Sequence, residues 1–126
     1  MKWTNEQLQA INDSGENIIF SAGAGSGKPA VLTQRVITKL KNGININNLL
    51  ILTFTNAAAA EMKERIRTAI KKDSELTAQL DYIDSAYITT FDSFSMSVVK
   101  KYYYLLNISP NITVLDSSIC DTVRKQ

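Results

Sequence analysis

Short apolar runs alternate along the chain with longer segments that have helical periodicity. An apolar run of about four to eight residues without polar alternation is typical of a strand buried on both faces of a parallel sheet. Such runs, and shorter mixed ones, predict strands over residues 17–21, 49–54, 87–90 and 112–115. Because the predicted strands and helices alternate, the pattern indicates an α/β fold in which helices flank a parallel sheet.

Helices are predicted where apolar residues recur every three or four positions after a capping residue. Thr4 and Gln7 form a capping-box pattern at the first such segment. In the second segment Leu32, Val36 and Leu40 share one face, and Gly43 marks its end. The predicted helices are 5–13, 30–41, 57–71, a polar one over 74–83, one capped by Asp92 or Ser93 that runs to 106, and the start of another within 117–126.

The helix over 57–71 carries the most detailed prediction. Its buried stripe is expected to consist of Ala58, Met62, Ile66 and Ala69. Asn56 precedes it as the candidate N-cap. Glu61 and Arg65 are four residues apart, so we expect them to pair on the exposed side and to contribute about 0.2–0.5 kcal/mol.

A glycine loop lies between the first predicted strand and the helix after it. The loop consists of Ala22, Gly23, Ala24, Gly25, Ser26, Gly27 and Lys28, and Pro29 follows it. Glycines leave backbone N–H groups open to a phosphate, and the helix N-terminus adds partial positive charge. A lysine after the last glycine reaches the β- and γ-phosphates, which makes Lys28 the candidate catalytic residue. The alternative is a flexible Gly/Ser turn, but strand, glycines, lysine and helix together favour nucleotide binding by residues 22–29.

The loop departs in two places from the pattern G-x-x-x-x-G-K-[ST]. Ala22 stands where the pattern has glycine, and Pro29 stands where it has Ser or Thr. That hydroxyl normally binds Mg²⁺, whereas proline has neither a hydroxyl nor a backbone N–H. Because proline is tolerated in the first turn of a helix, we expect the fold to survive. We expect Mg²⁺-ATP binding and ATPase activity to be weak or absent, and we assign no metal ligand.

Composition and charge mainly exclude kinds of functional site and cellular location. The 126 residues predict one domain, and the absence of histidine excludes histidine-based catalysis and most zinc sites. The single cysteine, Cys120, excludes an internal disulfide and fits a reducing compartment. No apolar run is long enough for a membrane span, and no signal-peptide core is present, so we expect a cytoplasmic protein. The net charge of +2 permits nucleic-acid binding without arguing for it.

Four segments together resemble the UvrD/Rep-like superfamily-1 DNA helicases, including helicase–nuclease proteins of the AddA type. They are the glutamine motif at 3–7, the loop at 22–28 with 31–36 after it, a segment close to motif Ia at 52–62, and a Thr-aromatic-Asp-Ser-Phe segment at 90–94. The resemblance covers nearly the whole chain, from Trp3 to about Asp116. The segment close to motif Ia, at this spacing after the loop, is the most specific of the four.

The resemblance implies an ATP-dependent DNA helicase that translocates on single-stranded DNA in repair or recombination. It implies a partial RecA-like P-loop fold, with residues 1–126 as the incomplete N-terminal part of the ATP-binding motor domain. ATP and Mg²⁺ would be its cofactors, and single-stranded DNA and the remaining helicase domains its partners. Two alternatives stay open, namely a P-loop module that binds nucleotide or phosphate without hydrolysis, and a structural remnant without a ligand.

The resemblance also assigns roles to individual residues. Gln7 would hydrogen-bond the adenine edge, since its amide offers both a donor and an acceptor. The residues expected at single-stranded DNA are Phe54, Thr55, Asn56, Thr90, Phe91 and Ser93. A base stacked on an aromatic ring contributes about 1–3 kcal/mol, and polar groups at a helix N-terminus can hold a phosphate. From spacing alone, Phe54 is better explained as core and Asn56 as a cap, and only the resemblance favours DNA contact. Asp92 stands where many relatives have histidine, which makes contact by Asp92 itself doubtful.

The C-terminal part of the chain gives weaker predictions. The helical spacing of Phe94, Val98, Tyr102 and Leu105 predicts core packing, with DNA contact as the alternative. Asp116 follows an apolar run as an acidic Mg²⁺ ligand would, but serines follow it, and we interpret it as a bystander. The absence of the other helicase motifs predicts an N-terminal fragment or a truncated gene product. We expect such a fragment to self-associate through exposed sheet edges.

Overall fold

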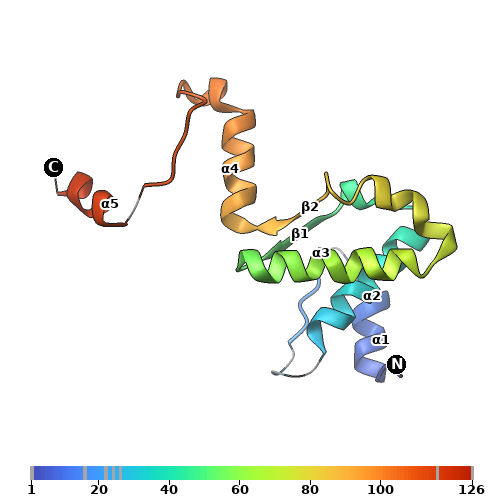
Figure 1. The fold of residues 1–126 in the computed structure, drawn as a ribbon. Helices are drawn as coiled ribbons and strands as arrows, with labels where there is room; N and C mark the ends of the chain where they lie inside the picture. Colours follow the sequence, from blue (N-terminus) through green and yellow to red (C-terminus); the bar gives the residue numbers. More distant parts are fainter. Residues whose placement is uncertain are drawn as a thin grey trace. The chain divides into compact units, whose positions relative to one another are not determined.

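The computed structural model describes residues 2–15, 17–21, 23, 25, 27–115 and 117–125, except for the side chains of Ser117 and Ser118. The predictions for Ala22, Ala24, Ser26 and Asp116 therefore fall outside the described residues. The elements are α1 (Asn5–Asn12), α2 (Lys28–Lys41), the 3₁₀ turn η1 (Ile46–Asn48), β1 (Leu50–Thr53), α3 (Asn56–Lys71), the 3₁₀ helix η2 (Ser74–Asp81), β2 (Tyr87–Thr90), α4 (Phe91–Lys101), the 3₁₀ turn η3 (Tyr103–Leu106) and α5 (Ser117–Arg124) (Figure 1). The chain divides into two compact units, Met1–Phe91 and Asp92–Gln126.

The centre of the first unit is a strand–helix–strand arrangement. β1 and β2 pair in parallel, with Leu50 opposite Tyr87 and Thr53 opposite Thr90. α3 connects the two strands, as a parallel pair requires, and lies along the sheet (Figure 1). The predicted mixed α/β fold with a parallel sheet is therefore confirmed for the described residues, and that sheet has two strands.

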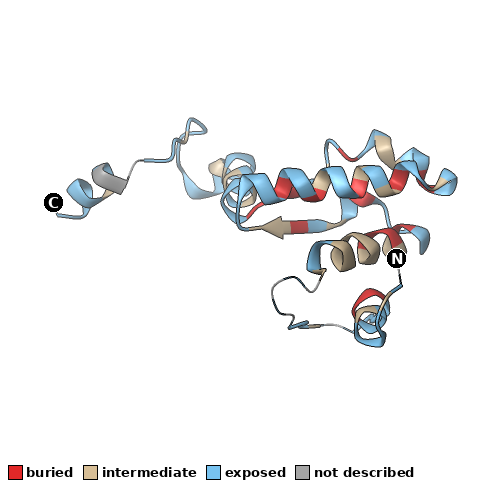
Figure 2. Cartoon of the chain, turned by 60° about the horizontal axis from the view of Figure 1, so that its bottom comes forward, coloured by how far each residue is buried: buried red, intermediate tan, exposed pale blue. Residues whose placement is uncertain are grey.

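The core of the first unit lies where α2 and α3 meet the sheet. Its most completely buried side chains are Ile46, Ile66, Ile70 and Ile83. Figure 2 shows buried positions recurring along α3 with exposed positions between them. Val36 on α2 belongs to the same cluster. This cluster packs α2 and α3 against β1 and β2, the elements at whose ends Lys28, Phe54 and Phe91 lie.

The stripe predicted for α3 is right in its centre and wrong at its ends. Met62 and Ile66 are buried as expected, but Ala59 is buried in place of Ala58. At the other end Ile70 is fully buried, whereas Ala69 is only half-buried. Both sets fit a helical period, and the observed one buries the larger isoleucine, which removes more apolar area from water.

Two predicted strands are absent from the described residues. Residues 17–21 form no strand, and the side chain of Ile19 is 95% exposed. Residues 112–115 form no strand either, and the Ile112 N–H donates to the Pro110 carbonyl in a turn. Sequence periodicity cannot report whether a neighbouring strand is present to pair with, and β1 and β2 pair only with each other among the described residues.

Several helix ends differ from the predictions. α2 begins at Lys28 rather than at residue 30, and α4 begins at Phe91, so neither Asp92 nor Ser93 is its cap. The N-cap of α3 is Thr55, whose hydroxyl accepts from the Ala58 N–H, and not Asn56. A threonine one residue earlier satisfies the same orphan N–H group, which single-sequence reasoning cannot distinguish.

Two further predictions concern the second half of the chain. The polar helix expected over 74–83 is the 3₁₀ helix η2, and the helix expected up to residue 106 ends at Lys101 before the separate turn η3. Core packing of Phe94, Val98, Tyr102 and Leu105 is wrong, because none of them is buried and Leu105 is 68% exposed. Among the described residues, no helix has the length and apolar character needed to cross a membrane.

Candidate functional site

The capping box at α1 fixes the side chain of Gln7. The Gln7 N–H donates to Thr4 Oγ1 at 3.2 Å, and the Thr4 N–H donates to Gln7 Oε1 at 2.9 Å, as the sequence predicted. A Cβ built on Gly27 would lie 3.6 Å from Gln7 Nε2. The amide of Gln7 therefore lies beside the last glycine of the loop, although the two are far apart in sequence.

The glycines of the loop are required by its backbone. Gly25 and Gly27 have φ angles of 77° and 76°, in the left-handed region that costs other residues about 1–2 kcal/mol. Gly27 is also the N-cap of α2 and has no side-chain cap. Among the described residues no side chain therefore caps the N–H groups at the start of α2, which is the arrangement that an anion needs.

The first turn of α2 carries Lys28 and Pro29. Lys28 is the first residue of the helix and is exposed. The Val31 N–H donates to the Gly27 carbonyl at 3.0 Å, so the intrahelical bonds begin one turn in. The first N–H groups of a helix have no intrahelical partner, so α2 loses no hydrogen bond to Pro29 and runs through it as expected.

A hollow of about 900 Å³ joins the start of α2 to α1. Its lining includes the amide of Gln7, the ammonium group of Lys28 and the apolar side chains of Phe20 and Val31. A cation, an amide and apolar surface in one hollow suit a ligand that is both charged and partly apolar. Gln7, Gly23 and Lys28, which the sequence assigned to one nucleotide site, all line this hollow.

Arg35 lines the same hollow, and sequence reasoning missed it. Its guanidinium Nη1 donates to the Ala10 carbonyl at 2.7 Å, near the end of α1, and its Cζ lies 5.9 Å from the centre of the Phe20 ring. A cation at a helix C-terminus is favourable, so Arg35 holds α1 against α2. The only signal in the sequence was its spacing of four residues from Val31 on one helical face.

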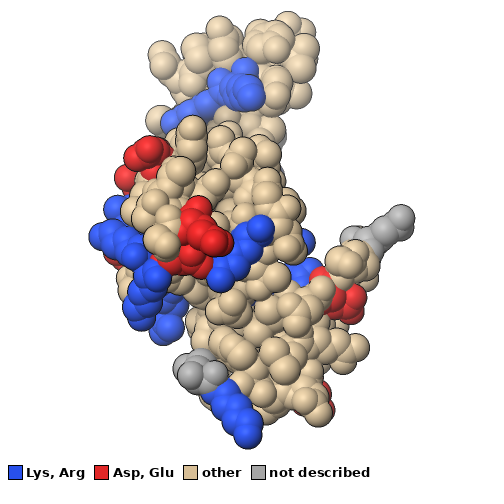
Figure 3. Space-filling view, turned by 90° about the vertical axis from the view of Figure 1, so that its right-hand side faces the viewer, with Lys and Arg blue, Asp and Glu red and all other residues tan. Residues whose placement is uncertain are grey.

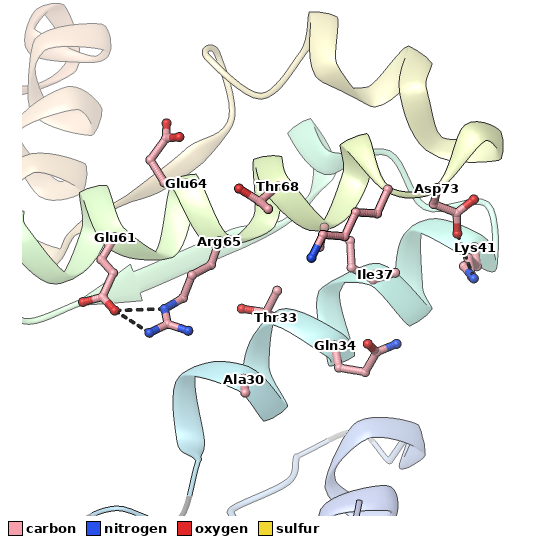
Figure 4. Close-up of a pocket in the computed structure, with 12 residues that line it drawn as sticks. Ala30, Thr33, Gln34, Ile37, Lys41, Glu61, Glu64, Arg65, Thr68 and Asp73 are labelled. Atoms are coloured by element: carbon pink, nitrogen blue, oxygen red, sulfur yellow. Dashed lines mark hydrogen bonds and ion pairs between the residues drawn. The ribbon is translucent and has the colours of Figure 1, made fainter. Parts of the chain in front are cut away.

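A second groove, of about 750 Å³, lies between α2 and α3 and contains none of the predicted site residues (Figure 4). Its charged groups compensate one another. Lys41 Nζ lies 2.8 Å from Asp73, and the predicted Glu61–Arg65 pair is confirmed at 2.7 Å. The hydrogen bond from Lys41 holds the pKa of Asp73 below its ordinary value and raises the pKa of Lys41. These paired charges stabilise helix packing and offer little to a charged ligand.

The carboxyl ends of β1 and β2 bring two aromatic rings together. Because Thr53 pairs with Thr90, the next residues along the two strands, Phe54 and Phe91, are also neighbours. Their ring centres are 5.8 Å apart with an angle of 31°, and the side chains are 92% and 52% exposed. Two adjacent exposed rings form a platform on which a base or another flat group can stack.

The other residues predicted to contact DNA lie close in sequence to Phe54 and Phe91, which form this aromatic platform. Thr55 and Asn56 are exposed at the start of α3, where helical N–H groups favour an anion. Thr90 is 6% exposed, so its side chain belongs mainly to the packing under the platform. Ser93 lies in the first turn of α4, within the unit Asp92–Gln126. Contact of any of these residues with DNA stays a prediction.

On the face drawn in Figure 3 the basic side chains form no concentrated patch, and several of them lie beside acidic ones. Among the residues that the structure describes, no cluster of three or more His, Cys, Asp or Glu is placed to hold a metal ion. The residue after Lys28 is proline, which offers no oxygen ligand from its side chain. The described groups of the loop therefore do not fit a Mg²⁺ ion bound by the protein.

Comparison with known proteins identifies the family. Residues 3–126 match the family model for the UvrD/REP helicase N-terminal domain. The chain is 44% identical to the AddA-type ATP-dependent helicase/nuclease protein of Pediococcus pentosaceus over 98% of this chain, and 47% identical to that of Heliobacterium modesticaldum over 93%. It is 40% identical to that of Geobacillus thermodenitrificans over 98%. The chain belongs to the UvrD/REP helicase N-terminal domain family, which confirms the resemblance found in its sequence.

The chain spans only a small part of these relatives. The aligned region covers 11% of the Pediococcus protein and 9% of the Heliobacterium protein. The helicase and nuclease activities in their names belong to proteins many times longer than this chain. Those names therefore supply context for the chain without assigning it an activity.

Proposed function

We propose that this chain is the ATP-binding segment of an ATP-dependent DNA helicase that translocates on single-stranded DNA in repair or recombination. The observation that carries the proposal is the glycine loop, in which Gly25 and Gly27 have left-handed backbones and lead into α2 at Lys28. The parallel β1–α3–β2 arrangement supports a partial RecA-like architecture. Family membership and the names of the relatives support the helicase part of the proposal.

The hollow of about 900 Å³ would hold the nucleotide. The phosphates would lie at the start of α2, where Lys28 supplies a point charge and Gly27 leaves the N–H groups uncovered. The base would lie toward α1, where the capping box holds the amide of Gln7 in one orientation. A pre-oriented amide loses little side-chain entropy on binding, which favours base recognition at this position.

The aromatic platform of Phe54 and Phe91 would hold single-stranded DNA. One or two bases would stack on the exposed rings, and a backbone phosphate would lie at the start of α3 near Thr55 and Asn56. The hydroxyl oxygen of Thr55 accepts from the Ala58 N–H, and its hydrogen can still donate to a phosphate. The carboxyl end of parallel strands is where α/β folds commonly bind ligands.

A second candidate function has a specific observation in its favour. Pro29 removes one backbone donor and one hydroxyl from the loop, which favours a module that binds nucleotide or phosphate without turnover. The two candidates share the nucleotide hollow and differ in hydrolysis and in DNA binding. ATPase activity that single-stranded DNA stimulates would favour the helicase candidate.

Equilibrium titration with fluorescently labelled ATP tests the nucleotide part of the proposal. We expect saturable binding to the full chain and a loss of about tenfold or more in affinity for Lys28→Ala, because a charged contact to phosphate contributes about 1.5–3 kcal/mol. Lys71→Ala is the matched control, since Lys71 is an exposed lysine in the last turn of α3. Equal affinities for the two variants would reject the proposed phosphate site.

A further inference from the structure

The second residue of α2 distinguishes this loop from one built to bind a metal-complexed nucleotide. In such a loop a Ser or Thr after the lysine coordinates Mg²⁺. Here Pro29 occupies that position, directly after Lys28 at the start of the helix. The loop therefore has the lysine and the glycine directly before it, but it lacks both the metal-binding hydroxyl and one N–H donor.

Two described groups near the loop are poor substitutes for the missing hydroxyl. The hydroxyl of Thr33, one turn further along α2, donates to the Pro29 carbonyl at 2.7 Å and is held against the helix backbone. Glu6 is the one acidic residue among the described residues that line the hollow. A single carboxylate is a weak basis for binding Mg²⁺, which is coordinated by several oxygens in octahedral geometry.

The charges that remain favour the uncomplexed anion. Lys28 and Arg35 both line the hollow, and the N-terminus of α2 adds partial positive charge. A nucleoside triphosphate without Mg²⁺ carries more negative charge than its Mg²⁺ complex, so these groups attract it more strongly. Among the described residues of the loop, no side chain supplies an oxygen that could coordinate the metal and so compensate for this difference.

We propose that this site binds the metal-free nucleoside triphosphate at least as tightly as the Mg²⁺ complex, so that Mg²⁺ adds no affinity through the protein. The inference rests on the proposed nucleotide-binding function. It has a second consequence, because Lys28 is solvent-exposed and salt screens such a charge over about 10 Å. Binding in EDTA should therefore weaken as the salt concentration rises, more steeply than binding in Mg²⁺.

The test is the equilibrium affinity of the full chain for labelled ATP, measured in EDTA and again in excess Mg²⁺. The native sequence should give a ratio of the two dissociation constants close to one, or favour EDTA. Pro29→Ala restores the backbone N–H without the hydroxyl. It should bind about tenfold more tightly in both conditions, because one charge-assisted hydrogen bond returns, and its ratio should not change.

Pro29→Thr restores both groups and separates the two effects. It should bind more tightly than the native sequence and should prefer the Mg²⁺ condition by about tenfold or more. Circular dichroism of both variants checks that α2 remains folded, which the first-turn position of residue 29 favours.

Two results would overturn the inference while leaving the proposed function in place. One is a native chain that binds tenfold more tightly in Mg²⁺ than in EDTA. The other is a tightly binding Pro29→Thr variant that gains no preference for Mg²⁺. Absence of ATP binding by the native chain in both conditions would instead reject the proposed function, and the inference with it.

Discussion

Two regions of the unit Met1–Phe91 offer ligands different kinds of contact. At the start of α2 the contacts come from the backbone, because Gly25 and Gly27 adopt left-handed conformations and Lys28 adds one charge. At the carboxyl ends of β1 and β2 they come from the side chains of Phe54 and Phe91. The first region suits a compact anion, and the second suits flat bases without regard to their sequence.

Because the contacts differ, we expect ligand binding at each region to be lost through a different kind of substitution. A backbone cradle tolerates changes of side chain until a Cβ forces a new φ angle. A stacking platform tolerates small changes in backbone conformation but not the loss of an aromatic ring. Both regions are fixed by the same buried cluster around Ile66, so damage to that cluster should not distinguish between them.

Ile66→Ala should have the largest effect on the free energy of unfolding. It should weaken both regions together, so it should not distinguish ATP binding from DNA binding. Ile66 is fully buried in α3, and truncation of a buried isoleucine costs about 2–5 kcal/mol of unfolding free energy. Urea denaturation measures the loss. Ile19→Ala is the control, because Ile19 is 95% exposed and its truncation should cost less than about 0.5 kcal/mol. Similar losses for the two variants would contradict the observed core.

Phe54→Ala should affect the aromatic platform alone. Loss of one exposed ring should weaken binding of a single-stranded oligonucleotide by about 1–3 kcal/mol, with ATP affinity unchanged. Tyr82→Ala serves as the control, since Tyr82 is an aromatic residue that is 47% exposed outside the platform. Fluorescence anisotropy of a labelled oligonucleotide gives the affinities. If Phe54→Ala binds the oligonucleotide with unchanged affinity, the proposal that DNA binds at the platform is wrong.

Gly27→Ala should affect the glycine loop alone. At φ 76° an alanine is strained by about 1–2 kcal/mol, although its Cβ would meet only ordinary contact with Gln7. We expect lower stability and weaker ATP binding, with DNA binding retained. Gly43→Ala is the matched control, because Gly43 also has a positive φ, of 90°, but lies past the end of α2 and does not line the hollow. If the two variants bind ATP equally well, the left-handed backbone at Gly27 is not needed for the site.

Asp84→Asn should have the smallest effect and should change neither ligand affinity. Hydrogen bonds from Arg67, at 2.6 Å, and from Lys63 lower the pKa of Asp84 from its ordinary value of 3.8. Because the folded pKa is the lower one, the stabilisation is present above pH 3.8 and is lost as pH falls through the folded value. Acid titrations of both proteins should converge at low pH, whereas a constant difference would contradict the assignment.

The sequence predicted what depends on local spacing. The capping box of Thr4 and Gln7 and the pair of Glu61 and Arg65 lie within one helical turn, where spacing determines contact. The glycine loop could be predicted for the same reason. Residues 17–21 were misassigned because a strand exists only through a neighbour that periodicity does not reveal.

The contacts between distant segments could not be predicted. Phe54 and Phe91 are neighbours only because Thr53 is in register with Thr90, and register is a property of the folded sheet. The hydrogen bond from Arg35 to the end of α1 likewise joins helices that the loop separates. The nucleotide residues were therefore predicted from sequence and stay a prediction, whereas the geometry of the aromatic platform required the structure.

The most direct test of the account is a crossed binding measurement. Labelled ATP and a labelled single-stranded oligonucleotide are each titrated into the native chain, Lys28→Ala and Phe54→Ala, after the fold of each has been checked by circular dichroism. The account predicts that Lys28→Ala loses about tenfold or more of ATP affinity and keeps DNA binding, while Phe54→Ala shows the reverse. Folded variants that lose both ligands together, or neither, would contradict two separate sites on one core.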